Sequence, residues 1–174
     1  SHREDHFDIS DLLLEKPRKT LEDKGVSFEA AYAGDMVSNL AGGLHRKTTY
    51  IGNLDLALTV DLDKAGLIPG GKIFVSGNDT AGGENPTAEY IGDLQAVDNI
   101  EAPDGMRLYE WWYDQSLFKE KLSIRAGAMD LASEFGVTEY GSLYINSSFG
   151  VPPDLSANVP LSIFPYIGLG ARIK

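Results

Sequence analysis

The sequence predicts an all-β fold, an antiparallel up-and-down sheet of the kind that closes into a transmembrane β-barrel, after a short N-terminal helix. Three observations lead to this prediction. Apolar and polar residues alternate with a period of two from residue 26 onward, and unequal connections separate the alternating segments. No apolar run reaches the ~18 residues that a membrane helix needs, whereas barrel strands need only ~9–11 alternating residues.

The first 25 residues differ from the rest of the chain. They are polar and rich in charge, and Pro17 and Gly25 bracket a stretch that reads as one short helix, because proline suits a first helical turn and glycine a helix end. We therefore divide the chain into a polar arm with a short helix, residues 1–25, and a barrel portion, residues 26–174.

Six strands are predicted in the barrel portion. The clearest spans residues 53–61, where Leu54, Leu56 and Leu58 alternate with Asp55 and other small or polar residues. An aromatic strand and its partner form a hairpin across the tight connection 119–120. The predicted strands cover residues 26–33, 53–61, 73–78, 107–118, 122–129 and 167–174.

The connections between these strands alternate between short and long. Residues 63–70 and 119–120 form the short ones, and residues 37–47, 79–105 and 132–160 the long ones. Membrane barrels have this asymmetry, with short turns at one end and long loops at the other. The polar face of each strand is either the solvated face of a soluble β-sandwich or the wall of a water-filled pore, and periodicity alone leaves both open.

Composition excludes several function classes. The 26 acidic and 15 basic residues give a net charge of −11, which argues against binding to nucleic acid. Cysteine does not occur, and the three histidines, His2, His6 and His45, lie in the polar arm or in a loop. We find no catalytic triad, no metal-ligand motif and no phosphate-binding loop. The sequence therefore predicts no catalytic residue, no metal and no cofactor, and a protein that is not an enzyme.

Several motifs together resemble one known family. They occur in order along most of the chain: Gly34–Gly43, Tyr50–Asp55, Ile91–Ala102, Arg107–Gln115, Ser133–Phe135, Ile145–Gly150 with Pro152 and Pro153, and Leu155–Asn158. In this combination the chain resembles the carbohydrate-selective porins of bacteria, the OprB family.

The resemblance implies a sixteen-stranded barrel in the outer membrane of a Gram-negative bacterium. Such a barrel admits glucose and related sugars by passive diffusion through a constriction lined by arginines and acids. The expected partners are small carbohydrates, outer-membrane lipid and further copies of the chain. Because about six strands are encoded here and sixteen would need roughly 400 residues, at ~25 residues for each strand and connection, we expect the chain to be an N-terminal portion of such a barrel.

The candidate pore-lining residues are those that would present charge and an aromatic surface to a sugar. Strict alternation places Arg107 on the apolar face, so a β-bulge or a position at the aqueous rim is needed to bring it to the pore. For each candidate the alternative is a wall charge with no contact to sugar. A secreted soluble β-sandwich that binds glycans and a non-conducting structural barrel remain alternatives for the whole protein. The candidates are Asp55, Arg107, Glu110, Trp112, Asp114, Arg125 and Arg172.

Overall fold

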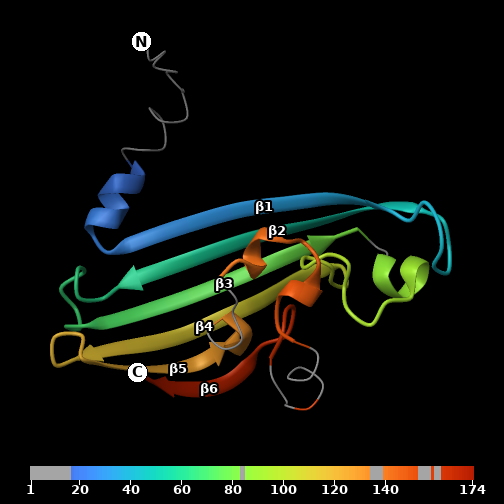
Figure 1. Ribbon diagram of the computed structural model, residues 1–174. Coiled ribbons are helices and arrows are strands. Elements are labelled where there is room, and N and C mark those ends of the chain that lie inside the picture. The colour runs from blue at the N-terminus through green and yellow to red at the C-terminus, as the bar shows by residue number, and fades with distance from the viewer. Residues whose placement is uncertain (1–16, 83–84, 134–138, 153–157, 159–161) are drawn as a thin grey trace, which may run out of the picture.

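A computed structural model describes residues 17–82, 85–133, 139–152, 158 and 162–174. These residues form one six-stranded sheet in which every strand pairs antiparallel with its neighbour in sequence, in the order β1-β2-β3-β4-β5-β6 (Figure 1). The predicted up-and-down arrangement of six strands is confirmed. The strands are β1 (Val26–Ser38), β2 (Thr48–Asp61), β3 (Gly71–Ala81), β4 (Gly105–Leu117), β5 (Leu122–Met129) and β6 (Gly168–Ile173).

A helix over residues 17–23 precedes the sheet, where Pro17 and Gly25 predicted one. Gly25 ends it with a φ of +83°, and its carbonyl accepts a hydrogen bond from Asp61 N at 2.6 Å. A Cβ at position 25 would lie 2.4 Å from the Asp61 carbonyl oxygen, so only glycine fits this close approach. Residues 1–16 of the predicted polar arm lie outside the described residues.

The first two strands are longer than predicted. Their pairing runs from Val26↔Val60 to Ser38↔Thr48, because the backbone ladder continues after the apolar alternation has ended. The β1–β2 connection, residues 39–47, is therefore no longer than the β2–β3 connection, residues 62–70, and the predicted strict alternation of short and long connections is wrong at this position. The other long connections, residues 82–104 and 130–167, and the short one, residues 118–121, agree with the prediction.

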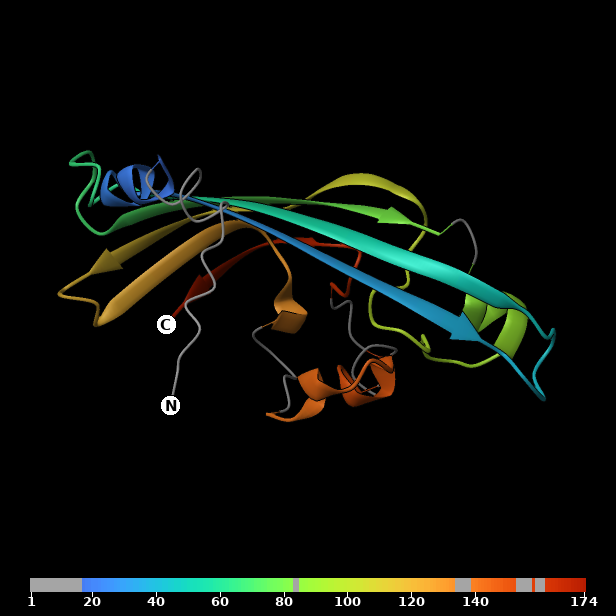
Figure 2. The same ribbon diagram turned by 90° about the horizontal axis from the view of Figure 1, so that it is seen from above.

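The two faces of the sheet differ in what covers them. Figure 2 shows residues 85–104 and the parts of 130–167 drawn in colour on one side of the sheet. The opposite face carries large apolar side chains with 38–82% of their surface exposed: Phe28, Tyr32, Leu56, Leu58, Ile73, Met106, Leu108, Trp111, Ile124, Leu169 and Ile173. In the part of the chain that the structure describes, no second sheet packs on this face, as a β-sandwich would require.

Among the residues that the structure describes, no helix is long and apolar enough to cross a membrane.

Strand β4 contains a β-bulge that changes which residues share a face. The register to β3 runs from Gly71↔Gln115 to Val75↔Trp111 and resumes at Gly77↔Leu108, so two residues, Tyr109 and Glu110, lie opposite Ser76. Beyond the bulge Arg107 pairs with Asn78, which pairs with Asp55 on β2. Arg107 therefore lies on the polar face, and the bulge resolves the conflict that strict alternation created.

The bulge also determines the position of Tyr109. Strict alternation along β4 would place this side chain on the apolar face together with Trp111, but its hydroxyl donates to Asp130 Oδ2 at 2.9 Å. Its ring meets Phe164 edge to face, with 5.8 Å between the ring centroids. Tyr109 thus packs against the segment between β5 and β6, on the covered side of the sheet.

Candidate functional site

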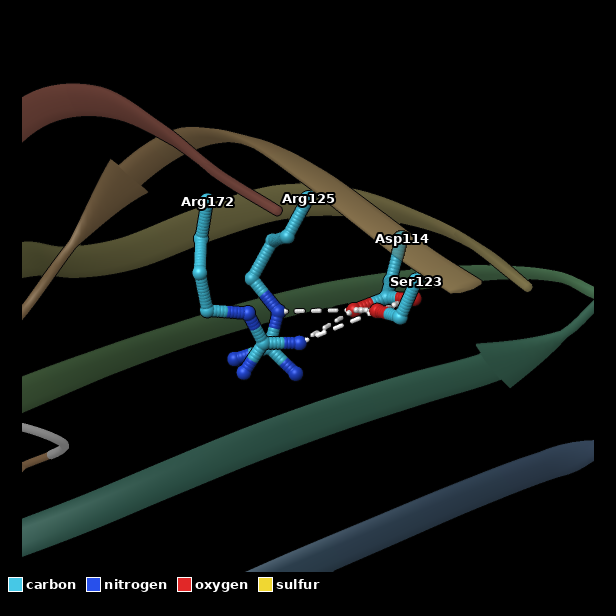
Figure 3. Close-up of polar contacts among 4 residues, drawn as sticks. All are labelled: Asp114, Ser123, Arg125 and Arg172. Carbon is cyan, nitrogen blue, oxygen red and sulfur yellow. Dashed lines mark hydrogen bonds and ion pairs between the residues drawn. The ribbon is translucent and has the colours of Figure 1, made fainter. Parts of the chain in front are cut away.

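The polar face carries a compact ion cluster where β4, β5 and β6 lie side by side. Asp114, Arg125 and Arg172 are direct neighbours across the three strands. Asp114 Oδ2 lies 3.0 Å from Arg125 Nε and 3.1 Å from Arg172 Nη2, so one carboxylate contacts two guanidinium groups. Figure 3 shows these side chains pointing to the same side of the sheet. The side chains are largely buried, with 11%, 21% and 15% of their surface exposed.

Ser123 completes this ion cluster. Its hydroxyl lies 2.9 Å from Asp114 Oδ1 and 3.1 Å from Oδ2, and it accepts a hydrogen bond from Arg172 Nη2 at 3.0 Å (Figure 3). Charge-assisted bonds of this kind are stronger than neutral ones and fix the orientation of the groups that form them. The cluster therefore presents two arginines held in place by the one carboxylate of Asp114.

An aromatic surface adjoins the ion cluster. The guanidinium carbon of Arg125 lies 3.7 Å from the centroid of the Trp112 ring, a cation–π contact, and Phe74 stacks on Trp112 with 4.9 Å between centroids. Gly127 on β5 permits this packing. Its φ is +146°, and a Cβ there would lie 2.6 Å from Trp112 Cα and 2.3 Å from the Trp111 carbonyl oxygen.

The remaining candidates lie on the same face but outside the ion cluster. Glu110 Oε1 accepts a hydrogen bond from Asp130 N at 2.9 Å, which connects the polar face to the start of the β5–β6 segment. Arg107 Nη1 donates to Thr80 Oγ1 at 2.7 Å, and its Nη2 donates to the Pro103 carbonyl. Asp55 Oδ2 accepts from Asn53 Nδ2 at 2.7 Å. The structure thus joins Trp112, Asp114, Arg125 and Arg172, and leaves Asp55, Arg107 and Glu110 at separate positions.

Two members of the arrangement were missed in the sequence. Phe74 alternates with apolar neighbours, so its position on the polar face follows from pairing with Trp112 and not from its own strand. Ser123 pairs with Ser116 and reaches Asp114 diagonally. Diagonal neighbours depend on register, and register could have been obtained only by fixing the β4–β5 turn first.

A cavity of about 760 Å³ opens beside the ion cluster at the short-connection end of the sheet. Asp114 and Arg125 line it, together with Lys72 and Asp61, which pair across β2 and β3. Acidic and basic side chains therefore both border this space. Hydroxyl-rich neutral molecules match such a surface, because it offers hydrogen-bond donors and acceptors without a dominant sign of charge.

The two long segments at the opposite end hold each other and the strands. Asn99 N donates to the Ile145 carbonyl at 2.7 Å, and Ser147 N donates to the Ala96 carbonyl at 3.0 Å. On the other side, the Tyr90 carbonyl accepts from Leu44 N and His45 N in the β1–β2 connection. The 82–104 segment is therefore fastened between two neighbouring connections.

Asp98 gives the packing of the 82–104 segment a dependence on pH. The residue is fully buried, at 0% exposure, and burial raises the pKa of its carboxyl; Asp35 on β1 raises this pKa further, while the Ile100 backbone N–H opposes the rise. A raised folded-state pKa means that the packed segment favours the neutral acid. The Asp98 carboxyl contributes fully to the stability of the folded protein below the ordinary aspartate pKa of ~3.9. This contribution is lost as the pH rises through the pKa of Asp98 in the folded state.

We therefore expect the melting temperature of the wild type to fall, relative to that of Asp98→Asn, as the pH is raised from ~4 to ~8. The measurement is a pair of melting curves for the two proteins at each pH. Asp93→Asn removes an exposed carboxyl from the same segment and is the matched control, for which we expect wild-type behaviour. Parallel pH profiles for wild type and Asp98→Asn would contradict the assignment.

The chain is similar to known proteins in both sequence and fold. A family model described as "Carbohydrate-selective porin, OprB family" matches residues 45–174. The chain belongs to this family. The resemblance seen in the sequence motifs is thereby confirmed, and no curated protein matches the chain.

Two solved structures of Pseudomonas putida OprB resemble the porin chain. The high-pH structure is 21% identical, with a TM-score of 0.79 over 94% of this chain and 40% of that one. The low-pH structure is 18% identical, with a TM-score of 0.47 over 73% of this chain and 40% of that one. The first confirms the barrel fold class, and the chain spans about 40% of the length of the porin that it matches. The six described strands form an open part of a barrel.

Proposed function

We propose that the protein is an outer-membrane porin through which glucose and related neutral sugars diffuse passively, without a catalytic step. The observation that carries the proposal is the ion cluster of Asp114, Arg125 and Arg172 beside the Trp112 ring, on the face opposite a bare apolar one. Membership of the carbohydrate-selective porins supports the same substrate class.

The apolar face supports a position in a bilayer. A contiguous exposed apolar surface is unfavourable in water, and large exposed patches mark sites of contact with protein or lipid. In a barrel wall, lipid-facing and lumen-facing residues alternate, and the outward band is apolar. We infer that outer-membrane lipid covers the face that carries Leu56, Leu108 and Trp111.

The polar face supports sugar passage by offering exchangeable hydrogen bonds. A sugar that leaves bulk water must replace bonds to its hydroxyl groups, and the guanidinium donors and carboxylate acceptors of the ion cluster can provide them. The half-buried Phe74–Trp112 pair would contact the less polar C–H surface of a pyranose ring. Self-association of the barrel is part of the proposal only as an expectation from the family.

Two charge-removing variants test the proposal, because they should change ion selectivity in opposite directions. Arg125→Ala removes a positive charge from the pore face and should favour cations; Glu110→Ala removes a negative charge and should favour anions. Each should also change the rate of glucose-driven liposome swelling, about twofold or more, in a barrel that still assembles. The measurements are reversal potentials in planar bilayers and swelling rates for the whole protein.

Arg18→Ala is the control, because Arg18 lies on the terminal helix and its guanidinium pairs with Glu22 at 2.8 Å. Unchanged selectivity and swelling in both pore variants would remove these residues from the constriction. An assembled wild-type barrel that passes no sugar would instead favour a non-conducting structural role.

A further inference from the structure

A second cavity, of about 470 Å³, lies at the long-connection end of the sheet. The segments 82–104 and 130–167 form it together: Asp98 and Glu101 come from the first, and Asp130, Tyr144 and Phe149 from the second. Its volume falls within the ~300–1,000 Å³ that small-molecule pockets occupy. The ion cluster contributes no residue to its lining.

The ionisable side chains in this lining are acidic: Glu101, Asp130 and the buried Asp98, whose packing favours the neutral acid. No lysine or arginine occurs among the lining residues that the structure describes. Glu101 accepts hydrogen bonds from Thr87 N and Oγ1, and Asp130 accepts from Tyr109 and from Ala132 N. Because a carboxylate offers about four acceptor positions, both can accept further bonds from hydroxyl groups. The lining is mostly apolar, and within it the two carboxylates offer hydrogen-bond acceptors and repel anions.

An aromatic pair forms the wall contributed by the second segment. The rings of Tyr144 and Phe149 stack with 4.2 Å between centroids and an interplanar angle of 20°, and the two residues are 52% and 47% exposed. The backbone around them is fixed, because the Ile145 carbonyl accepts from Asn99 N and the Asn146 side chain accepts from Ser148 N at 2.9 Å. Hydrogen bonds within the protein therefore hold the exposed aromatic surface in place.

The position of this cavity relative to the ion cluster follows from strand β5. Arg125 lies in the cluster and Asp130 lines the cavity, and the chain between them spans ~17 Å at ~3.3 Å per residue. Both lie on the covered side of the sheet, since Asp130 bonds Tyr109 and Glu110 there. A solute entering from the long-connection end would meet the cavity before it meets the cluster.

We propose that this cavity is a vestibule site that binds neutral pyranose sugars and rejects sugar acids, upstream of the ion cluster. The proposal rests on the proposed porin function and adds to it a second site with its own selectivity. Sugar hydroxyl groups would donate to Glu101 and Asp130, while the C–H face of the ring packs on Tyr144 or Phe149. An anionic sugar of equal size would meet only like charges.

The test uses saturation-transfer NMR to measure the binding of glucose and of gluconate to the whole protein in detergent. We expect Phe149→Leu, which keeps an apolar side chain and removes the ring, to raise the glucose concentration at half-saturation roughly threefold to tenfold. Gluconate should bind at least about tenfold more weakly than glucose. Tyr140→Ala is the matched control, because Tyr140 lies in the same segment, is 67% exposed and does not line the cavity.

Tyr144→Leu provides a second variant should Phe149→Leu fail to fold, and heat-dependent migration on gels reports folding for each. Wild-type glucose binding in a folded Phe149→Leu or Tyr144→Leu protein would overturn the proposal, as would gluconate binding equal to that of glucose. Liposome swelling separates the two hypotheses. If sugar flux is normal and neither variant weakens glucose binding, the vestibule site alone is refuted. If both variants weaken glucose binding but the wild-type barrel passes no sugar, the porin function alone is refuted.

Discussion

Asp114→Ala is expected to destabilise the folded barrel by ~3 kcal/mol and to shift ion selectivity toward anions. The variant removes the carboxylate that Arg125 and Arg172 both contact, and it leaves two like charges close together on a largely buried surface. Removing one partner of a buried ion pair costs far more than the pair itself contributes, because the remaining charge has lost its compensation. Selectivity shifts because the two positive charges then dominate the local potential.

Denaturant titration of the whole protein folded into liposomes measures the loss of stability, and reversal potentials measure selectivity. Ser123→Ala is the matched control: it removes a hydrogen bond from the same carboxylate but no charge, so we expect ~1 kcal/mol and unchanged selectivity. Equal effects of the two variants would show that Asp114 acts through hydrogen bonding and not through its charge.

Leu56→Lys is expected to destabilise the barrel in a bilayer by ~2–4 kcal/mol. Leu56 lies near the middle of β2 on the bare apolar face and is 38% exposed, with Ala30 and Gly77 as its neighbours across the strands. A lysine there would place an ammonium group in hydrocarbon, and the cost of such a lipid-facing charge is greatest at the bilayer midplane.

Ala57→Lys is the control, because it introduces the same charged side chain on the opposite face of the same strand. Ala57 is the next residue on the same strand, but its neighbours are Glu29 and Ser76 on the polar face. We expect less than ~1 kcal/mol for this variant, because water and a carboxylate surround the new charge. Folding free energies from urea titration in liposomes compare the two. A larger loss for Ala57→Lys than for Leu56→Lys would reverse our assignment of the faces.

The sequence was sufficient for the number and order of the strands and for the face on which the members of the ion cluster lie. Period-two alternation is a local property, and it placed Trp112, Asp114, Arg125 and Arg172 on one face without knowledge of register. The antiparallel hairpin across residues 118–121 then made contact between β4 and β5 a near-necessary consequence. For these residues local pattern and tertiary structure agree.

What the sequence could not provide depends on pairing between segments. The position of Tyr109 depends on a bulge opposite Ser76, which belongs to another strand. The length of β1 and β2 depends on a ladder that continues through residues without an apolar pattern. The second cavity depends on hydrogen bonds between two irregular segments, and such contacts leave no periodic signal in either one.

The bulge in β4 changes which residue numbers face the polar side of the sheet. On the Asp114 side of the bulge, even-numbered residues face the polar side, and on the Arg107 side, odd-numbered residues do so. If β4 paired with β3 without the bulge while keeping all its residues, Met106 and Leu108 would turn toward the polar side and Arg107 toward the apolar one. Deleting one of the two residues opposite Ser76 would instead make the strand regular and leave these three side chains on their present faces. The extra residue thus allows one strand to carry two opposite numerical patterns along a single uninterrupted surface.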